Sequence, residues 1–182
     1  MNTPHPVVAL IGPSASGKSS VVRELHRRGV VDVRPTWTTR PRRADETDGS
    51  VEHRFVTDDE FDALARARFF VDTVAMFGLP YRYGLPGPLA FGVARPEIVL
   101  LRAPLVERFR RLGVDCTVVQ IEDSPARTAA RLAQRNMSAV ELQARLVDNE
   151  RELVAGRAVA DVVFSNVDSI GALADRIAAV AA

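Results

Sequence analysis

Short apolar runs alternate with longer amphipathic segments along most of the chain. Buried strands are predicted over residues 7–11, 98–101, 118–121 and 162–164, because each is a short, continuous apolar run. Such alternation is typical of an α/β fold in which helices cover both faces of a parallel sheet. Helices are predicted over residues 19–28, 104–112, 125–134, 138–154 and 169–180.

A different pattern occupies the chain between the first two of these strands. Residues 34–39 are predicted as a short strand that leads into a polar loop. Residues 51–57, 69–77 and 81–83 look extended and alternating, and no segment between them is long enough for the crossover helix of a parallel pair. Thr57 and Glu60 form a capping box, which predicts a short helix up to about residue 67. We therefore expect a small antiparallel β insertion in the α/β core.

Composition narrows the class of protein. The 182 residues, 47% of them apolar, are enough for one buried core, so a single domain is expected. The net charge of +1 gives no strong overall field, and neither nucleic acid nor a membrane is expected as a partner. The first apolar run is too short for a signal peptide or a membrane span. The single Cys116 excludes an internal disulfide and fits a cytoplasmic location.

The first strand leads into the most informative motif of the chain. Residues 12–19 match the P-loop pattern of a glycine, four residues and then Gly-Lys-Ser, in the strand–loop–helix context that this motif requires. Its backbone N–H groups and the following helix N-terminus are expected to hold nucleotide phosphates. Lys18 would reach the β and γ phosphates, and the Ser19 hydroxyl would bind Mg²⁺. The predicted ATP-binding residues here are Gly12, Pro13, Ser14, Ala15, Ser16, Gly17, Lys18, Ser19 and Ser20.

Arginine supplies the other strongly basic side chains, since Lys18 is the only lysine. Arg40 and Arg43 are three residues apart on the polar loop and could form a two-pronged phosphate clamp. Alternatively, this loop is solvated and the acidic residues that follow neutralise it. Arg131 and Arg135 are four residues apart and share a helix face, which could equally be a solvated face.

Several motifs, in their order along the chain, resemble those of the guanylate kinase family. The resemblance covers nearly the whole chain. Each motif after the P-loop is short, and their order makes the resemblance specific. They are the P-loop, residues 38–43 (Thr-Thr-Arg-Pro-Arg-Arg), Gly49 with residues 51–56, residues 60–61, residues 81–84 (Tyr-Arg-Tyr-Gly), residues 131–135, residues 145–146, and residues 161–163 leading to Asn166.

The resemblance implies a P-loop kinase with a parallel core sheet, a small inserted acceptor-binding β subdomain and a helical lid. The core would be residues 1–35, 90–125 and 156–182, the acceptor-binding subdomain residues 36–89, and the lid residues 126–155. It also implies ATP with Mg²⁺, catalytic roles for Lys18, Arg135 and Arg145, and contact of Arg131 and Asn166 with ATP. The implied acceptor-binding residues are Thr36, Arg40, Arg43, His53, Asp72, Tyr83 and Arg102.

The positions that would contact the acceptor differ from the family pattern. This chain has His53 for tyrosine, Asp72 for glutamate, Leu85 for serine or threonine, and Arg102 at a strand end that is acidic in the family. His53, the turn at residues 83–86 and Arg102 are similar to those of a sister family, the ribose 1,5-bisphosphate phosphokinases. The acceptor is expected to be GMP or a related nucleoside monophosphate, or alternatively a ribose bisphosphate.

We therefore expect an ATP-dependent phosphotransferase, a monomer or homodimer, whose acceptor is the phosphate of a small monophosphate. The alternative is a non-catalytic guanylate kinase-like binding module, but such modules usually lack an intact P-loop. His53 is expected to bind the acceptor phosphate best as an imidazolium. Asp123 is expected to act either as an outer-sphere partner of Mg²⁺ or as the cap of the helix that follows it.

Overall fold

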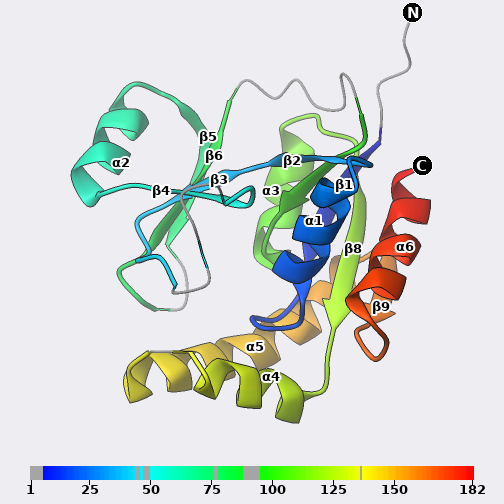
Figure 1. The fold of residues 1–182 in the computed structure, drawn as a ribbon. Helices are drawn as coiled ribbons and strands as arrows, with labels where there is room; N and C mark the ends of the chain where they lie inside the picture. Colours follow the sequence, from blue (N-terminus) through cyan, green and yellow to red (C-terminus); the bar gives the residue numbers. More distant parts are fainter. Residues whose placement is uncertain (1–5, 44–45, 47–49, 76–77, 88–94, 136) are drawn as a thin grey trace, which may run out of the picture.

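A five-stranded parallel sheet forms the centre of the protein (Figure 1). The computed structural model describes residues 6–43, 46, 50–75, 78–87, 95–135 and 137–182. The strand order is β2-β7-β1-β8-β9, and every neighbouring pair is parallel, which confirms the predicted core sheet. The strands are β1 (Val7–Ile11), β2 (Asp32–Arg34), β7 (Glu97–Leu100), β8 (Thr117–Glu122) and β9 (Val162–Ser165).

Pro35 divides what the sequence predicted as one strand over residues 34–39. Proline has no backbone N–H to donate to a strand ladder, and the chain changes sheet at this residue. β2 therefore pairs with β7 in the central sheet, whereas β3 (Thr36–Thr38) pairs with β4 and β6 in a second sheet.

Helices cover both faces of the central sheet, and all five residues of β1 are buried as a result. On one face, Leu10 lies in an apolar cluster with Leu25 and Ile177. On the other face, Ala9 shares a cluster with Phe109. The first cluster includes α1 (Lys18–Arg27) and α6 (Ile170–Ala181); the second includes the 3₁₀ helix η1 (Ala103–Leu105), α3 (Val106–Arg111) and the C-terminal part of α5 (Ala139–Val159).

The second sheet has four strands in the order β4-β3-β6-β5. The predicted antiparallel pairing is confirmed for β3–β6 and β5–β6, whereas β3 and β4 are parallel. Parallel pairing needs a connection of about a dozen residues, and the polar loop over residues 39–52 is long enough to provide it. The strands are β4 (His53–Phe55), β5 (Phe70–Ala75) and β6 (Arg82–Pro86).

The predicted capping box begins α2 (Asp58–Arg66): the Thr57 hydroxyl accepts the Glu60 N–H, and the Glu60 carboxylate accepts the Thr57 N–H. Phe61 of this helix is 2% exposed and stacks on Phe70 with 4.7 Å between ring centroids. The guanidinium carbon of Arg82 lies 4.6 Å from the Phe61 centroid. These contacts attach α2 to the second sheet.

The helices α4 (Pro125–Ala133) and α5 follow β8 and lie next to each other at the end of the sheet near the P-loop (Figure 1). α5 continues to Val159, beyond the predicted end at residue 154. None of the helices in the described part of the chain is long and apolar enough to cross a membrane.

Replacing Phe61 with alanine should destabilise the protein by about 3–5 kcal/mol, because a buried aromatic ring and its stack on Phe70 are lost. Chemical denaturation of the wild type and the variant measures this difference. Val71→Ala, at a residue that is 38% exposed on β5, is the matched control, with an expected loss below about 1 kcal/mol. Equal losses in the two variants would contradict the anchoring role of Phe61.

Candidate active site

The loop between β1 and α1 has backbone conformations that require glycine. Gly12 has φ +132° and Gly17 has φ +107°. A Cβ on Gly12 would lie 2.2 Å from the Ile121 carbonyl oxygen, and one on Gly17 would lie 2.5 Å from Asn166 Nδ2. Ala15 also has a positive φ of 64°, which is a strained conformation for a residue with a side chain. The P-loop therefore packs closely against β8 and the residue that follows β9.

Side chains from three other parts of the chain hold this loop by its backbone. Arg131 of α4 donates to the Ala15 carbonyl at 2.9 Å, and Asn166 donates to the Ser16 carbonyl at 2.9 Å. Asn149 of α5 accepts the Ser14 N–H at 2.7 Å and donates to the Ser14 carbonyl at 3.1 Å. The structure thus places the candidate residues Arg131 and Asn166 at the P-loop. Sequence reasoning missed Asn149, because helical spacing alone does not show which face of α5 meets the P-loop.

Lys18 folds back onto the loop. Its Nζ donates to the carbonyl oxygens of Gly12 at 2.6 Å and Pro13 at 2.7 Å. Burial, and next the charge of Arg102, lower the pKa of Lys18 to about 7; Glu152 opposes this shift, while Arg135 and Arg43 add to it. The ammonium is therefore close to losing its proton at neutral pH, mainly because it is buried and also because Arg102 lies near it.

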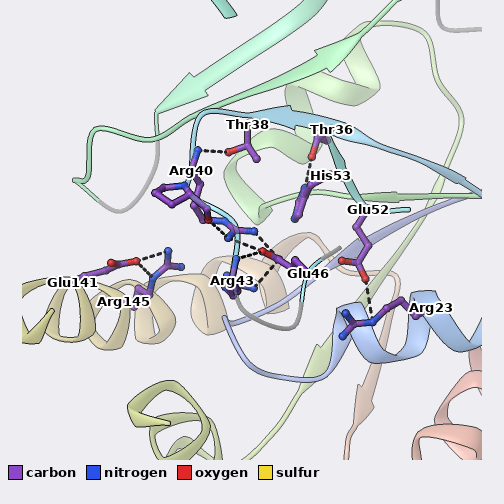
Figure 2. A network of polar contacts seen from close by, with 11 residues as sticks. Arg23, Thr36, Thr38, Arg40, Arg43, Glu46, Glu52, His53, Glu141 and Arg145 are labelled. Atoms are coloured by element: carbon purple, nitrogen blue, oxygen red, sulfur yellow. Dashed lines mark hydrogen bonds and ion pairs between the residues drawn. The ribbon is translucent and has the colours of Figure 1, made fainter. Parts of the chain in front are cut away.

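The candidate clamp arginines share one carboxylate (Figure 2). Arg40 donates from Nη1 and Nη2 to the two oxygens of Glu46 at 2.9 and 2.7 Å, and the Arg43 N–H donates to Glu46 at 2.8 Å. The side chains of Arg40 and Glu46 are 4% exposed, so this is a buried ion pair and not a solvated loop. Burial opposes the ionisation of Glu46, but hydrogen bonds from Arg40 and Arg43 outweigh it and lower its pKa to about 2. The Nε of Arg40 is buried and makes no hydrogen bond within the described structure.

His53 lies beside this clamp. Its Nδ1 is 2.9 Å from the Thr36 hydroxyl across the parallel β3–β4 pair, and its ring meets that of Tyr83 edge to face at 6.1 Å. Burial, followed by the charge of Arg40, lowers the pKa of His53 to about 4. The ring is therefore neutral at neutral pH in the unliganded protein. The expectation that the imidazolium form binds the acceptor phosphate best concerns the liganded site and stays a prediction. A neutral ring can still offer one hydrogen bond to a ligand.

Two cavities meet at the P-loop and share Ser14, Lys18 and Ser19 in their walls. The first, called the acceptor cavity below, also has Thr36, His53, Asp72, Tyr83 and Arg102 in its wall. The second, called the P-loop cavity, is also lined by Ala15, Gly17, Ser20, Arg23, Arg43, Glu46, Arg131, Arg135, Asn166 and Ile170. The fold thus brings most of the candidate site residues to two adjoining spaces.

The far wall of the acceptor cavity is mainly apolar. Two charged side chains lie in this wall, and both form ion pairs. Asp72 pairs with Arg108 of α3, and Arg102 pairs with Asp148 and Glu152 of α5. The Arg102 Nε lies 3.1 Å from the Glu152 carboxylate. The remaining wall residues are Val74, Gly84, Leu85, Leu100, Leu101, Leu105 and Phe109.

Arg135 and Arg145 both act on the clamp by their charge. Burial first, and then Arg40, Arg135 and Arg145, lower the pKa of Arg43 to about 10, although Glu46 opposes the shift. Arg145 is 2% exposed, and its Nη2 lies 2.9 Å from Glu141 one turn earlier on α5. Figure 2 shows Arg145 reaching from α5 toward Arg43.

The residues at Ser19 fit a magnesium ion. The Glu52 side chain is 1% exposed and contributes a hydrogen bond with Ser19, and its Oε1 has no hydrogen-bond partner in the described structure. A hydroxyl and a carboxylate are oxygen ligands of the kind that Mg²⁺ takes, together with water and phosphate oxygens. Glu52 forms an ion pair with Arg23, whose Nε is 3.7 Å from its Oε1. Sequence reasoning missed Glu52, because it lies far along the chain from Ser19.

Asp123 is not the cap of α4, so that alternative is wrong. Its carboxylate is 1% exposed and binds Arg131 at 2.7 Å and Arg127 at 3.3 Å. The cap of α4 is instead Ser124, whose hydroxyl accepts the Arg127 N–H. Asp123 thus holds Arg131 against the P-loop.

Comparison with known proteins extends the similarity over the whole chain. No family model matches it. A guanylate kinase of Thermobifida fusca is 34% identical over 98% of this chain and 92% of that protein. The ribose 1,5-bisphosphate phosphokinase PhnN of Acidiphilium cryptum is 33% identical over 88% of this chain and 83% of that protein. The crystal structure of guanylate kinase from Anaplasma phagocytophilum superimposes with a TM-score of 0.71 at 22% identity, covering 99% of this chain and 86% of that one.

The structural likeness agrees with the fold, and the similarity to the Thermobifida fusca protein covers 98% of the chain. The chain belongs to the guanylate kinase family.

Proposed function

We propose that the protein transfers the γ-phosphoryl group of ATP to the phosphate of a nucleoside monophosphate, GMP or a close relative of it. The observation that carries this proposal is that Ser14, Lys18 and Ser19 border both cavities. ATP in the P-loop cavity and an acceptor in the acceptor cavity would meet over the same lysine. Membership of the guanylate kinase family supports the same activity.

Transfer between two phosphates needs little proton chemistry, because the acceptor oxygen is already anionic. The protein would contribute position and charge neutralisation. Lys18, Arg135 and Arg145 would neutralise the charge that spreads over the γ-phosphoryl oxygens. Bound Mg²⁺, held through Ser19 and Glu52, would neutralise phosphate charge. Arg40, Arg43, Tyr83 and the neutral His53 would hold the acceptor phosphate.

The far wall of the acceptor cavity favours a nucleobase over a second phosphate. Its leucines, Val74 and Phe109 suit a flat, apolar ring face, and the Asp72 carboxylate can accept hydrogen bonds from a guanine N–H edge. A second phosphate would need an available cation, but the charge of Arg102 is balanced by Asp148 and Glu152. Ribose 1,5-bisphosphate remains the second candidate, because relatives of that name are similar over most of the chain.

The division into parts is also proposed. The second sheet, within residues 36–89, would bind the acceptor, and residues 126–155 would include the lid, with the rest as the core. We propose a cytoplasmic location, where ATP is available and the free thiol of Cys116 stays reduced.

ATP and Mg²⁺ should give ADP only when an acceptor is present, with GMP or dGMP turned over better than AMP, CMP, UMP or ribose 1,5-bisphosphate. Lys18→Ala should lower kcat/KM by an amount that corresponds to about 3–5 kcal/mol of lost transition-state stabilisation, since a preorganised charge at the γ-phosphate is lost. A coupled assay of ADP release measures both, and circular dichroism checks that the variant is folded. Fast ATP hydrolysis without any acceptor, or normal turnover by folded Lys18→Ala, would refute the proposed function.

Arg40→Ala and Arg43→Ala should each raise the KM for the acceptor by about 10- to 100-fold, because charge-assisted hydrogen bonds to its phosphate are lost. The KM for ATP should change much less, since the loop of these residues is separate from the P-loop. Arg42→Ala removes the same charge from an exposed position of the same loop and serves as the control. A selective loss of ATP affinity in the Arg40 and Arg43 variants would show that the clamp holds the other substrate.

The pKa of Lys18 can be measured directly, because Lys18 is the only lysine of the chain. In protein labelled with ¹³C-lysine, the single lysine signal should titrate near the pKa of about 7 without ligand. A bound, non-hydrolysable ATP analogue should raise this pKa, because phosphates favour the ammonium form. Nucleotide binding at pH 8 should therefore take up a proton, and binding well below pH 7 should not. A lysine pKa near 10 without ligand would contradict the buried, positive surroundings of Lys18.

A further inference from the structure

The buried face of α5 is polar, which is unusual for a helix packed against a core. Arg145, Asn149 and Glu152 are 2%, 8% and 2% exposed and follow one another at helical spacing. A buried amide costs free energy unless its hydrogen bonds are made. The Asn149 amide makes two bonds to one residue far along the chain: it accepts the N–H of Ser14 and donates to the carbonyl of Ser14. Its burial is thus tied to one point of the P-loop.

That point lies where the two cavities meet. Ser14 borders both, together with Lys18 and Ser19. Its neighbour Ala15 has a positive φ of 64°, a conformation that persists only when the surrounding structure holds it. The Ser14 N–H is already donated to Asn149, so the phosphate-binding N–H groups would be those that follow it.

Asn149 also constrains the position of Arg145 relative to the P-loop. The two residues are four apart on α5, so they share a face one helical turn apart. The paired bonds to Ser14 therefore limit where α5 can place Arg145 relative to the P-loop. The charge of Arg145 also acts on Arg43, since it helps to lower the pKa of Arg43.

We propose that Asn149 is a positioning residue for phosphoryl transfer, which acts by holding Ser14 and Arg145 in a fixed relation. This inference rests on the proposed function. A small apolar residue at position 149 could pack on the loop but could not fix its position, because it would leave the Ser14 N–H and carbonyl unpaired.

Asn149→Ala should lower kcat by about 10- to 100-fold, the kinetic equivalent of two lost buried hydrogen bonds, and change the KM of the acceptor by less than about twofold. Gln143→Ala removes an amide from an exposed position of the same helix and should leave kcat unchanged.

The decisive measurement is the double variant. In an Arg145→Ala background, Asn149→Ala should cost little more, because the residues act as a unit. Losses that multiply would overturn the proposal.

Amide hydrogen exchange tests the contact itself. The Ser14 amide should be protected from exchange in the unliganded wild type and in Gln143→Ala. It should exchange faster in Asn149→Ala. An unprotected Ser14 amide in the wild type would overturn the proposal, even if the Asn149→Ala variant did not fold. Inactive wild type would refute the proposed function and this inference together. Active wild type with normal kcat in folded Asn149→Ala would refute this inference alone.

Discussion

Burial of several positive charges near one another is the constraint that shapes the site. Arg102, Arg135 and Arg43 act on the charge of Lys18, and Arg40, Arg135 and Arg145 act on that of Arg43. Burial first, and these neighbouring charges next, lower the pKa of Lys18 and that of Arg43. Such a cluster suits phosphates, which bring the missing negative charge. Before any ligand binds, however, the fold has to hold these side chains together by other means.

Buried carboxylates provide that support, and each comes from a different place. Glu46 holds the clamp from within its own loop, Asp123 holds Arg131 from the end of β8, and Glu152 holds Arg102 from α5. Because a carboxylate in such a pair fixes a guanidinium in one orientation, the arginines are set in place before the substrate arrives. The cost of ordering them is then met during folding and not during binding.

The sequence predicts those features that depend on local pattern. The apolar runs predicted the parallel sheet, the Thr57 capping box predicted the start of α2, and the glycine spacing predicted a loop in which Gly12 has φ +132°. Features that depend on which distant segments meet were not predicted. The parallel β3–β4 pair, the Asn149 bonds to Ser14 and the place of Glu52 beside Ser19 arise from tertiary packing. The lowered pKa of unliganded His53, about 4, was not predicted, because burial and the charge of Arg40 cannot be read from a single strand pattern.

The same packing limits how the α4–α5 pair could close. From Asn149 onward, α5 is bound to the P-loop, its Glu152 accepts the Ala103 N–H at 3.0 Å, and Ala155 and Val159 pack on the core. Moving this half would break buried hydrogen bonds and expose apolar surface at once. Arg145 belongs to the anchored part as well, since it lies one helical turn before Asn149 and pairs with Glu141 within the same helix. A closing motion would therefore have to bend the chain before Glu141 and leave Arg145 in its fixed relation to Ser14.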